Sequence, residues 1–192
     1  TKKSISRARY RLGPRPLIEL FRALARPLAT ARGLPQAFHR GLRLVALDAT
    51  LADLPDSPAN ARVFGRRKTP RGRAAFPQAK LIGLLEIGTH AFFDLLVRPH
   101  QRHELIPGLR LVRRSVRRGM LVLWDRGFYS FTMLQAVLEQ GAHSLGRAKQ
   151  SIILEPLRRL PDGSYLAQVY PTPYARRRRR AGLRVRVIEY RV

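Results

Sequence analysis

The sequence is marked first by what it lacks. It contains no cysteine, which excludes disulfide bonds and thiolate metal sites. No apolar run approaches the roughly 20 residues that a membrane-spanning helix needs, and no secretory signal is visible at the start. His100 and His103 are spaced as His-x-x-His, but no Glu-x-x-His spacing occurs, and we do not expect a zinc site. Carboxylates remain as the metal ligands to consider.

Acidic residues are also scarce, with 12 aspartates and glutamates against 38 lysines and arginines, a net charge of +26. A folded domain this basic repels itself unless a polyanion neutralises it, so nucleic acid is the leading partner. Arginine far outnumbers lysine, which favours forked contacts to phosphate. The basic residues are spread along the chain rather than confined to one amphipathic helix, so we expect DNA and not a membrane surface.

The N-terminal 40 residues are predicted to form a basic helical segment. Two helical pieces are expected within residues 4–30, broken at Gly13-Pro14. In the second piece Leu17, Phe21, Leu24 and Leu28 share one face at helical spacing. The arginines of the first piece form either a solvated face or a DNA contact.

Residues 41–192 predict a layered domain of α/β (mixed α+β) class, in which helices flank a mixed sheet. We expect strands over 42–50, 79–88, 90–99, 120–124, 143–149, 151–157, 164–170 and 183–192, and helices over 57–64, 104–116 and 130–141. Residues 65–73 are expected to be a mobile basic loop and 175–182 a disordered arginine run. Residues 120–124 contain no polar residue, which predicts a strand buried on both faces.

Two aspartates stand in the same local context. Asp48 and Asp125 each end an apolar strand, and the ends of such strands are where ligands bind in open α/β sheets. If the strands are neighbours, the two carboxylates converge and cannot both stay ionised without a cation between them. Their hard oxygens suit Mg²⁺ or Mn²⁺, and two such ions about 3.5–4 Å apart promote phosphoryl transfer. Each aspartate could instead cap a turn.

The aspartates lie in longer segments, LVALDATLADLPDSPANARVFG and GMLVLWDRGFYSF. Between and after them come FPQAKLIGLLEIGTHAFFDLLV, GRAK, LPDGSYLAQV and VRVIEYRV. Together these segments resemble DDE-type transposases of bacterial insertion sequences, in the insertion-sequence-four-like branch whose third carboxylate lies in a Tyr…Arg…Glu…Lys helix. The resemblance runs from about residue 4 to the last residue. Asp-Arg-Gly-Phe after an apolar strand is its most specific element.

The resemblance implies a ribonuclease-H-like catalytic core over residues 41–192. Asp48 and Asp125 would be catalytic and would hold two divalent ions, Mg²⁺ or Mn²⁺. Arg147 and Lys149 would face DNA, as would Arg126. The implied partner is double-stranded DNA, both element ends and target, bound by a homodimer in a synaptic complex in the bacterial cytoplasm, at the nucleoid. From its charge alone, the run that contains Arg176, Arg177 and Arg178 is expected to grip phosphates.

The sequence departs from the family pattern at two places. Ala49 stands where the pattern usually has Gly or Ser, although Thr50 fits. The Tyr…Arg…Glu…Lys signature is absent, because Glu189 lies in a strand-like run with no lysine after it. We therefore interpret the chain as a fragment, incomplete at the C-terminus, that binds DNA and metal weakly and cleaves poorly.

Two other functions stay open at this point. The first is a stand-alone metal-dependent nuclease in which Glu104 completes the site; a glutamate favoured by a helix dipole is the simpler explanation of that residue. The second is a non-catalytic DNA-binding remnant. Phe128 and Tyr129 could stack on a base or pack under the following helix, and Glu86 is expected to pair with an arginine on a neighbouring strand.

Overall fold

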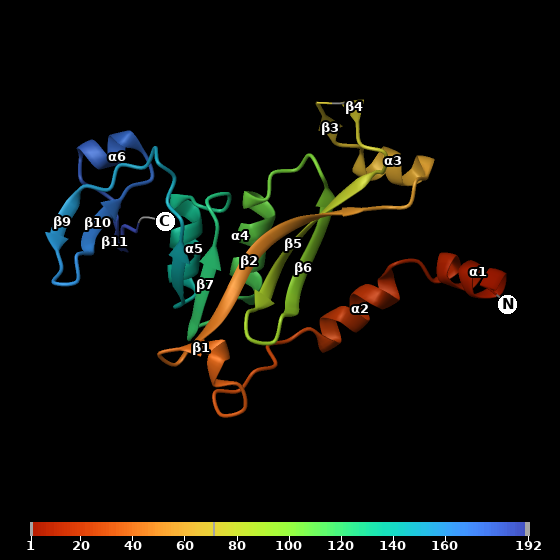
Figure 1. Cartoon of the computed structure of the whole chain (residues 1–192), viewed down its shortest axis with the longest axis horizontal. Coiled ribbons are helices and arrows are strands. Elements are labelled where there is room, and N and C mark those ends of the chain that lie inside the picture. Colours follow the sequence, from red (N-terminus) through yellow and green to blue (C-terminus); the bar gives the residue numbers. More distant parts are fainter. Residues whose placement is uncertain (1, 71, 191–192) are drawn as a thin grey trace.

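The computed structural model describes residues 2–70 and 72–190 and is built around one central mixed sheet (Figure 1). Its strands are β2 (Leu42–Asp53), β5 (Gln78–Glu86), β6 (Ala91–Pro99), β7 (Met120–Trp124) and β8 (His143–Gly146), in the spatial order β6-β5-β2-β7-β8. Strands β6, β5 and β2 are antiparallel, whereas β2, β7 and β8 are parallel. The short β1 (Phe38–His39) pairs with the start of β2 and follows the 3₁₀ helix η1 (Pro35–Ala37).

One face of this sheet packs against α4 (Leu105–Ser115) and α5 (Phe131–Glu139). Side chains alternate along a strand, so Val45 and Leu47 of β2 point to the same face and are buried there with Leu111 and Met133 of the helices. Ser130 begins α5 as predicted, because its hydroxyl accepts the backbone N–H of Met133 at 3.0 Å. Both helices that the sequence predicted here are confirmed.

The opposite face of the sheet is less covered. Leu121 and Leu123 of β7 are half-buried, and Phe92 and Val97 of β6 are each 46% exposed. The prediction that β7 is buried on both faces is therefore wrong. An unbroken apolar run does not distinguish a covered face from one that is left partly open.

Strand β2 is longer than predicted. It does not end near Asp48 but continues to Asp53, because β5 pairs with it as far as Gln78. The predicted hairpin of β5 and β6 is confirmed. Beyond β2, Ser57 caps α3 (Pro58–Phe64) by accepting the N–H of Asn60 at 3.2 Å, also as predicted.

The segment expected to be a loop contains a small hairpin of β3 (Lys68–Thr69) and β4 (Gly72–Arg73). A second sheet, of β9 (Pro156–Arg159), β10 (Tyr165–Val169) and β11 (Leu183–Val187), lies beyond β8. Residues 151–155, predicted as strand, are irregular. The arginine run is not disordered, because Thr172 caps α6 (Pro173–Arg177) through the N–H of Ala175 at 3.1 Å.

The N-terminal segment contains α1 (Lys2–Leu12) and α2 (Arg15–Leu24), which break at Gly13-Pro14 as predicted and project away from the sheet (Figure 1). Helix α2 ends before Leu28, so that residue does not join the predicted apolar face. Leu17 and Leu24 remain 66% and 65% exposed. The division of the chain near residue 40 stays a prediction.

A buried carboxylate ties this segment to the sheet. Glu86 accepts the backbone N–H groups of Leu28 and Ala29, at 3.0 and 2.9 Å, and the hydroxyl of Thr89 at 2.7 Å. It also pairs with Arg43 of the neighbouring strand, the arginine partner that its strand position predicted. Burial alone would raise the pKa of Glu86, but the hydrogen bonds that it accepts together hold that pKa below its ordinary value.

Candidate active site

The register of two parallel strands brings Asp48 and Asp125 to the same level of the sheet. The last pair between β2 and β7 is Leu47 with Trp124; Asp48 is the next residue of β2, and Asp125 directly follows the end of β7. Neighbouring strands lie about 4.8 Å apart. Since side chains alternate along a strand, Asp48 of β2 is directed away from the face on which Leu47 is buried. Both aspartates are exposed.

One carboxylate oxygen of each aspartate is held by a hydrogen bond from a nearby backbone N–H group. Oδ1 of Asp48 accepts the N–H of Ala49 at 2.7 Å, and Oδ1 of Asp125 accepts the N–H of Gly127 at 2.8 Å. Below Asp125, Trp124 is 6% exposed, and beyond the turn Phe128 is 1% exposed. The turn that presents Asp125 is therefore anchored in the core at both ends.

The burial of Phe128 and Tyr129 also decides between the two functions considered for them. Phe128 is 1% and Tyr129 8% exposed, so both rings pack in the core rather than offering a face to a base. Burial raises the pKa of the Tyr129 hydroxyl above its ordinary value. This pair belongs to the support of the site, not to its surface.

Glu104 lies close to the same turn. A Cβ on Gly127 would lie 2.5 Å from Oε1 of Glu104 and 3.0 Å from Oδ1 of Asp125, so the two carboxylates approach the same small space. Glu104 also faces Lys80, whose Nζ is 3.7 Å from Oε2 and donates to the carbonyl of Arg102 at 3.0 Å. Only a residue without a side chain fits position 127 without displacing Glu104.

Strand β8 adds a cation beside Asp125. Gly146 pairs with Trp124, and the N–H of Arg147 donates to the Trp124 carbonyl at 3.4 Å. Arg147 therefore follows Gly146 at the level of Asp125. Lys149 comes two residues later and is exposed, as are Arg147 and Arg126. Arg126, along the chain, and Arg147, in the sheet, are thus the predicted DNA-binding residues close to Asp125.

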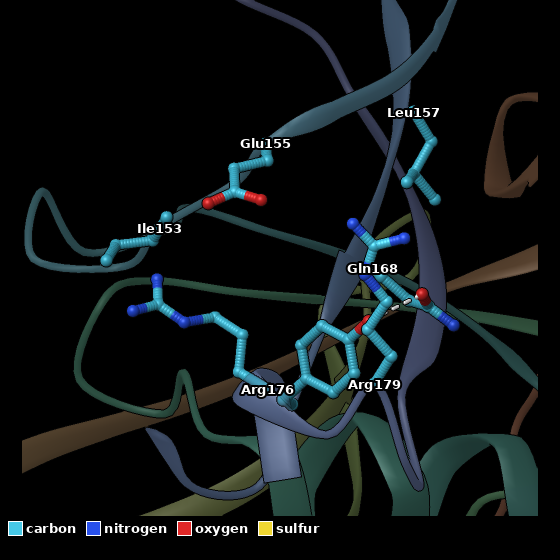
Figure 2. A pocket seen from close by; sticks show the side chains of 7 residues that line it. Ile153, Glu155, Leu157, Gln168, Arg176 and Arg179 are labelled. Carbon is cyan, nitrogen blue, oxygen red and sulfur yellow. Dashed lines mark hydrogen bonds between the residues drawn. The ribbon is translucent and has the colours of Figure 1, made fainter. Parts of the chain in front are cut away.

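The other predicted DNA contacts lie elsewhere. Arg176 and Arg177 are in α6 and Arg178 follows it, in the part of the chain built on the second sheet (Figure 1). The guanidinium of Arg178 lies 4.8 Å from the ring centre of Tyr174. Arg176 lines a hollow of about 90 Å³ together with Glu155 and Gln168, whose side chains Figure 2 shows from close by. This cluster and the two aspartates occupy different sheets.

A larger hollow, of about 360 Å³, borders the residues that follow Asp48. It is lined by Ala49, Thr50, Leu51, Arg67, Lys80, His100 and Glu104. His100 is held by a 2.9 Å hydrogen bond between its Nδ1 and the carbonyl of Phe64. No pattern in the sequence predicted this hollow, because its lining comes from four separate segments.

The donor set at Asp48 and Asp125 fits a hard divalent cation, since both side chains are carboxylates and each has an oxygen outside its backbone hydrogen bond. Over residues 2–70 and 72–190, no three aspartate, glutamate or histidine side chains gather as metal ligands. Glu189 is engaged elsewhere, where it accepts the hydroxyl of Tyr165 at 3.2 Å.

Comparison with known families identifies the family of this chain. Residues 39–190 match the model of the transposase DDE domain. The chain belongs to this family. Membership confirms the resemblance drawn from the sequence, and the mixed sheet described above confirms the expected α/β class.

Two curated relatives from Escherichia coli (strain K12) are similar over much of the chain. The putative transposase InsZ is 27% identical over 143 residues, which are 74% of this chain and 47% of the relative. The transposase InsG for insertion sequence element IS4 is 26% identical over 177 residues, 91% of this chain and 39% of the relative. The chain thus spans less than half the length of either relative.

A solved structure, a cryo-EM synaptic complex of piggyBac transposase with hairpin DNA, is similar with a TM-score of 0.40 and 16% identity, over 68% of this chain and 31% of that one. Among the helices of residues 2–70 and 72–190, none has the length and apolar character to cross a bilayer.

Proposed function

We propose that this chain is part of the catalytic core of a transposase that hydrolyses a phosphodiester at an element's end and joins the freed 3′-hydroxyl to target DNA. The observation that carries the proposal is the pairing of Leu47 with Trp124, after which Asp48 in β2 and Asp125, directly after β7, follow side by side. Family membership supports the same reaction class. Asp48 and Asp125 are the residues proposed to be catalytic.

Asp48 and Asp125 would hold two Mg²⁺ or Mn²⁺ ions through their carboxylate oxygens. When bound, such ions neutralise charge on the attacking and leaving oxygens of phosphoryl transfer. The chain's own contribution is positioning: the core-anchored turn from Trp124 to Phe128 fixes Asp125, and β5 pairing fixes Asp48.

The basic residues complete the proposal. Arg147 and Arg126 would neutralise phosphates next to the carboxylates, with Lys149 behind them, and Arg176, Arg177 and Arg178 would grip DNA at the second sheet. The proposed partner is duplex DNA, both element ends and target, in a homodimeric synaptic complex at the nucleoid. A net charge of +26 supports a polyanionic partner.

Residues 1–192 alone are proposed to cleave poorly, because no third carboxylate joins the two aspartates in the described part of the chain. The test combines binding and cleavage on one labelled duplex, in the presence and absence of Mn²⁺. The double variant Asp48→Asn/Asp125→Asn should lose Mn²⁺ binding and should bind metal-free DNA slightly more tightly, since repulsion of phosphate is removed. Efficient strand transfer by residues 1–192 would contradict the proposed impairment.

A second candidate, the nuclease in which Glu104 completes the site, is favoured by one observation, the approach of Glu104 to the Asp125 turn at Gly127. The ion pair with Lys80 offers Glu104 a different function, as a buttress of that turn. The DNA-binding remnant predicts instead that the double asparagine variant alters nothing but DNA affinity.

A further inference from the structure

A small basic hairpin lies at the far end of β2 from β1 (Figure 1). It comprises residues 66–70 and 72–74, with Arg67, Lys68 and Arg73 exposed. The sequence has no acidic residue between Asp56 and Glu86. We propose that this basic hairpin is a docking surface for the phosphate backbone of duplex DNA that passes along β2 from Asp48, an inference that rests on the function proposed above.

The positive charges within the basic hairpin repel one another and destabilise it when no partner is bound. Lys68 and Arg73 are partners in the antiparallel register, so their side chains leave the same face directly opposite each other. Like charges in that arrangement repel and destabilise a strand pair. In the part of the chain that the structure describes, no carboxylate pairs with Arg67, Lys68 or Arg73. An external polyanion would neutralise all three.

The backbone of the basic hairpin is held in place before any partner binds. Arg66 anchors its base by donating to the carboxylate of Asp56 and to the carbonyl of Ala75. The N–H of Ala74 donates to the carbonyl of Arg67 at 2.7 Å, and the hydroxyl of Thr69 to the carbonyl of Gly72 at 3.1 Å. One arginine is used for folding, which leaves the other cations available for binding.

The position of Arg67 connects the hairpin to the candidate active site. Arg67 lines the hollow of about 360 Å³ that Ala49 and Thr50, the residues directly after Asp48, also line. Lys80 and His100 lie in the same hollow. A DNA strand with one phosphate at Asp48 and the next ones along β2 would meet Arg67 first and the Lys68–Arg73 pair after it. The basic residues of the chain are spread over many segments rather than confined to one amphipathic helix, which favours DNA over an anionic membrane.

The test is the salt dependence of DNA binding by the full chain. Each phosphate contact contributes about 0.9 to the slope of log K against log salt concentration. The variant Arg67→Gln/Lys68→Gln/Arg73→Gln should lower the magnitude of that slope by about 2 to 3 for a fluorescent duplex, and should weaken binding at least tenfold at low salt. The matched control Arg110→Gln/Arg113→Gln/Arg118→Gln removes three exposed arginines on α4 and after it, and should lower the slope by less than one unit.

The single variant Lys68→Glu separates binding from folding. It places a carboxylate opposite Arg73, so it should stabilise the basic hairpin yet weaken DNA binding more than Lys68→Gln does. If wild-type chain binds DNA and the triple variant keeps the wild-type slope, the hairpin proposal is overturned while the proposed function stands. If the wild-type chain binds no duplex at any salt concentration, both are overturned. Equal losses in the hairpin and control variants would also overturn the hairpin proposal, because a diffuse field would then explain binding.

Discussion

Leu47 on β2 pairs with Trp124 on the parallel strand β7, so Asp48 in β2 and Asp125, directly after β7, each follow a member of this pair. Leu47 and Trp124 are buried in the core, at 1% and 6% exposure, whereas the aspartates that follow them are exposed. The relative height of the two carboxylates is therefore set by hydrophobic packing and not by the carboxylates, which repel each other in the absence of a cation.

Arg147, which lies beside Asp125 across the sheet, gives a prediction for DNA binding. It follows Gly146 on β8, level with Asp125. If it contacts one phosphate, Arg147→Gln should lower the magnitude of the salt slope by about one unit and weaken binding to all duplexes alike. Arg113→Gln, on α4, is the control. The two variants can be compared by fluorescence anisotropy, and identical slopes would remove Arg147 from the proposed interface.

Gly146 itself is predicted to be sensitive to substitution. A Cβ at this position would lie 2.1 Å from Nε1 of Trp124, so the indole would have to move. Gly146→Ala should destabilise the fold by about 1–3 kcal/mol, the usual cost of overpacking. Trp124 is the only tryptophan, so its fluorescence reports the displacement directly. Leu145→Val, at a 53% exposed neighbour, should change neither reading, and an unshifted spectrum in Gly146→Ala would contradict the predicted contact.

The buried pair of Glu86 and Arg43 gives a prediction for stability. Glu86→Gln removes the buried charge opposite the half-buried Arg43 and should cost about 3 kcal/mol, because Arg43 and the N–H groups of Leu28 and Ala29 lose a charged acceptor. Urea unfolding at neutral pH measures this. A control is Glu19→Gln, whose partner Arg22 lies on an exposed helix surface and whose loss should be nearly neutral.

The same carboxylate predicts a pH dependence. The pKa of Glu86 in the folded chain lies below its ordinary value of 4.5. Its stabilising effect is therefore complete above that value and is lost as the pH falls through the lower pKa of the folded state. Wild-type stability should fall with pH in this acidic window, and the Glu86→Gln chain should show a shallower fall. Parallel curves for the two chains would show that other carboxylates cause the loss.

Glu104 distinguishes the transposase core from the stand-alone nuclease. In the transposase account it buttresses the Asp125 turn with Lys80, so Glu104→Gln should alter Mn²⁺ affinity less than threefold. In the nuclease account the same change abolishes cleavage and weakens metal binding strongly. Mn²⁺ affinity by electron paramagnetic resonance decides between them, with Glu139→Gln on α5 as control.

The sequence predicted those features that depend on local chemistry. The serine caps at Ser57 and Ser130, the break at Gly13-Pro14 and the β5–β6 hairpin all follow from residues close together in the chain. The predicted pairing of Glu86 with an arginine was confirmed because a charge inside a strand needs a partner on the next strand.

The features that the sequence analysis did not predict depend on contacts between segments that are distant in the chain. The extension of β2 past Asp48 requires β5, and the half-open face of β7 depends on which elements cover the sheet. The arginine run became partly helical because of a threonine just outside it. Glu104 and Gly127 belong to separate segments of the chain, so no sequence periodicity could predict that they lie close together.

The central claim is that Asp48 and Asp125 form one metal site. Its most direct test is a titration of Mn²⁺ into the full chain, with both aspartate carboxylates observed by NMR through paramagnetic broadening. We predict that the two signals broaden together at the same Mn²⁺ concentration, and that Asp48→Asn abolishes the broadening of Asp125. Broadening of only one carboxylate, or of neither, would contradict the shared site and favour the DNA-binding remnant.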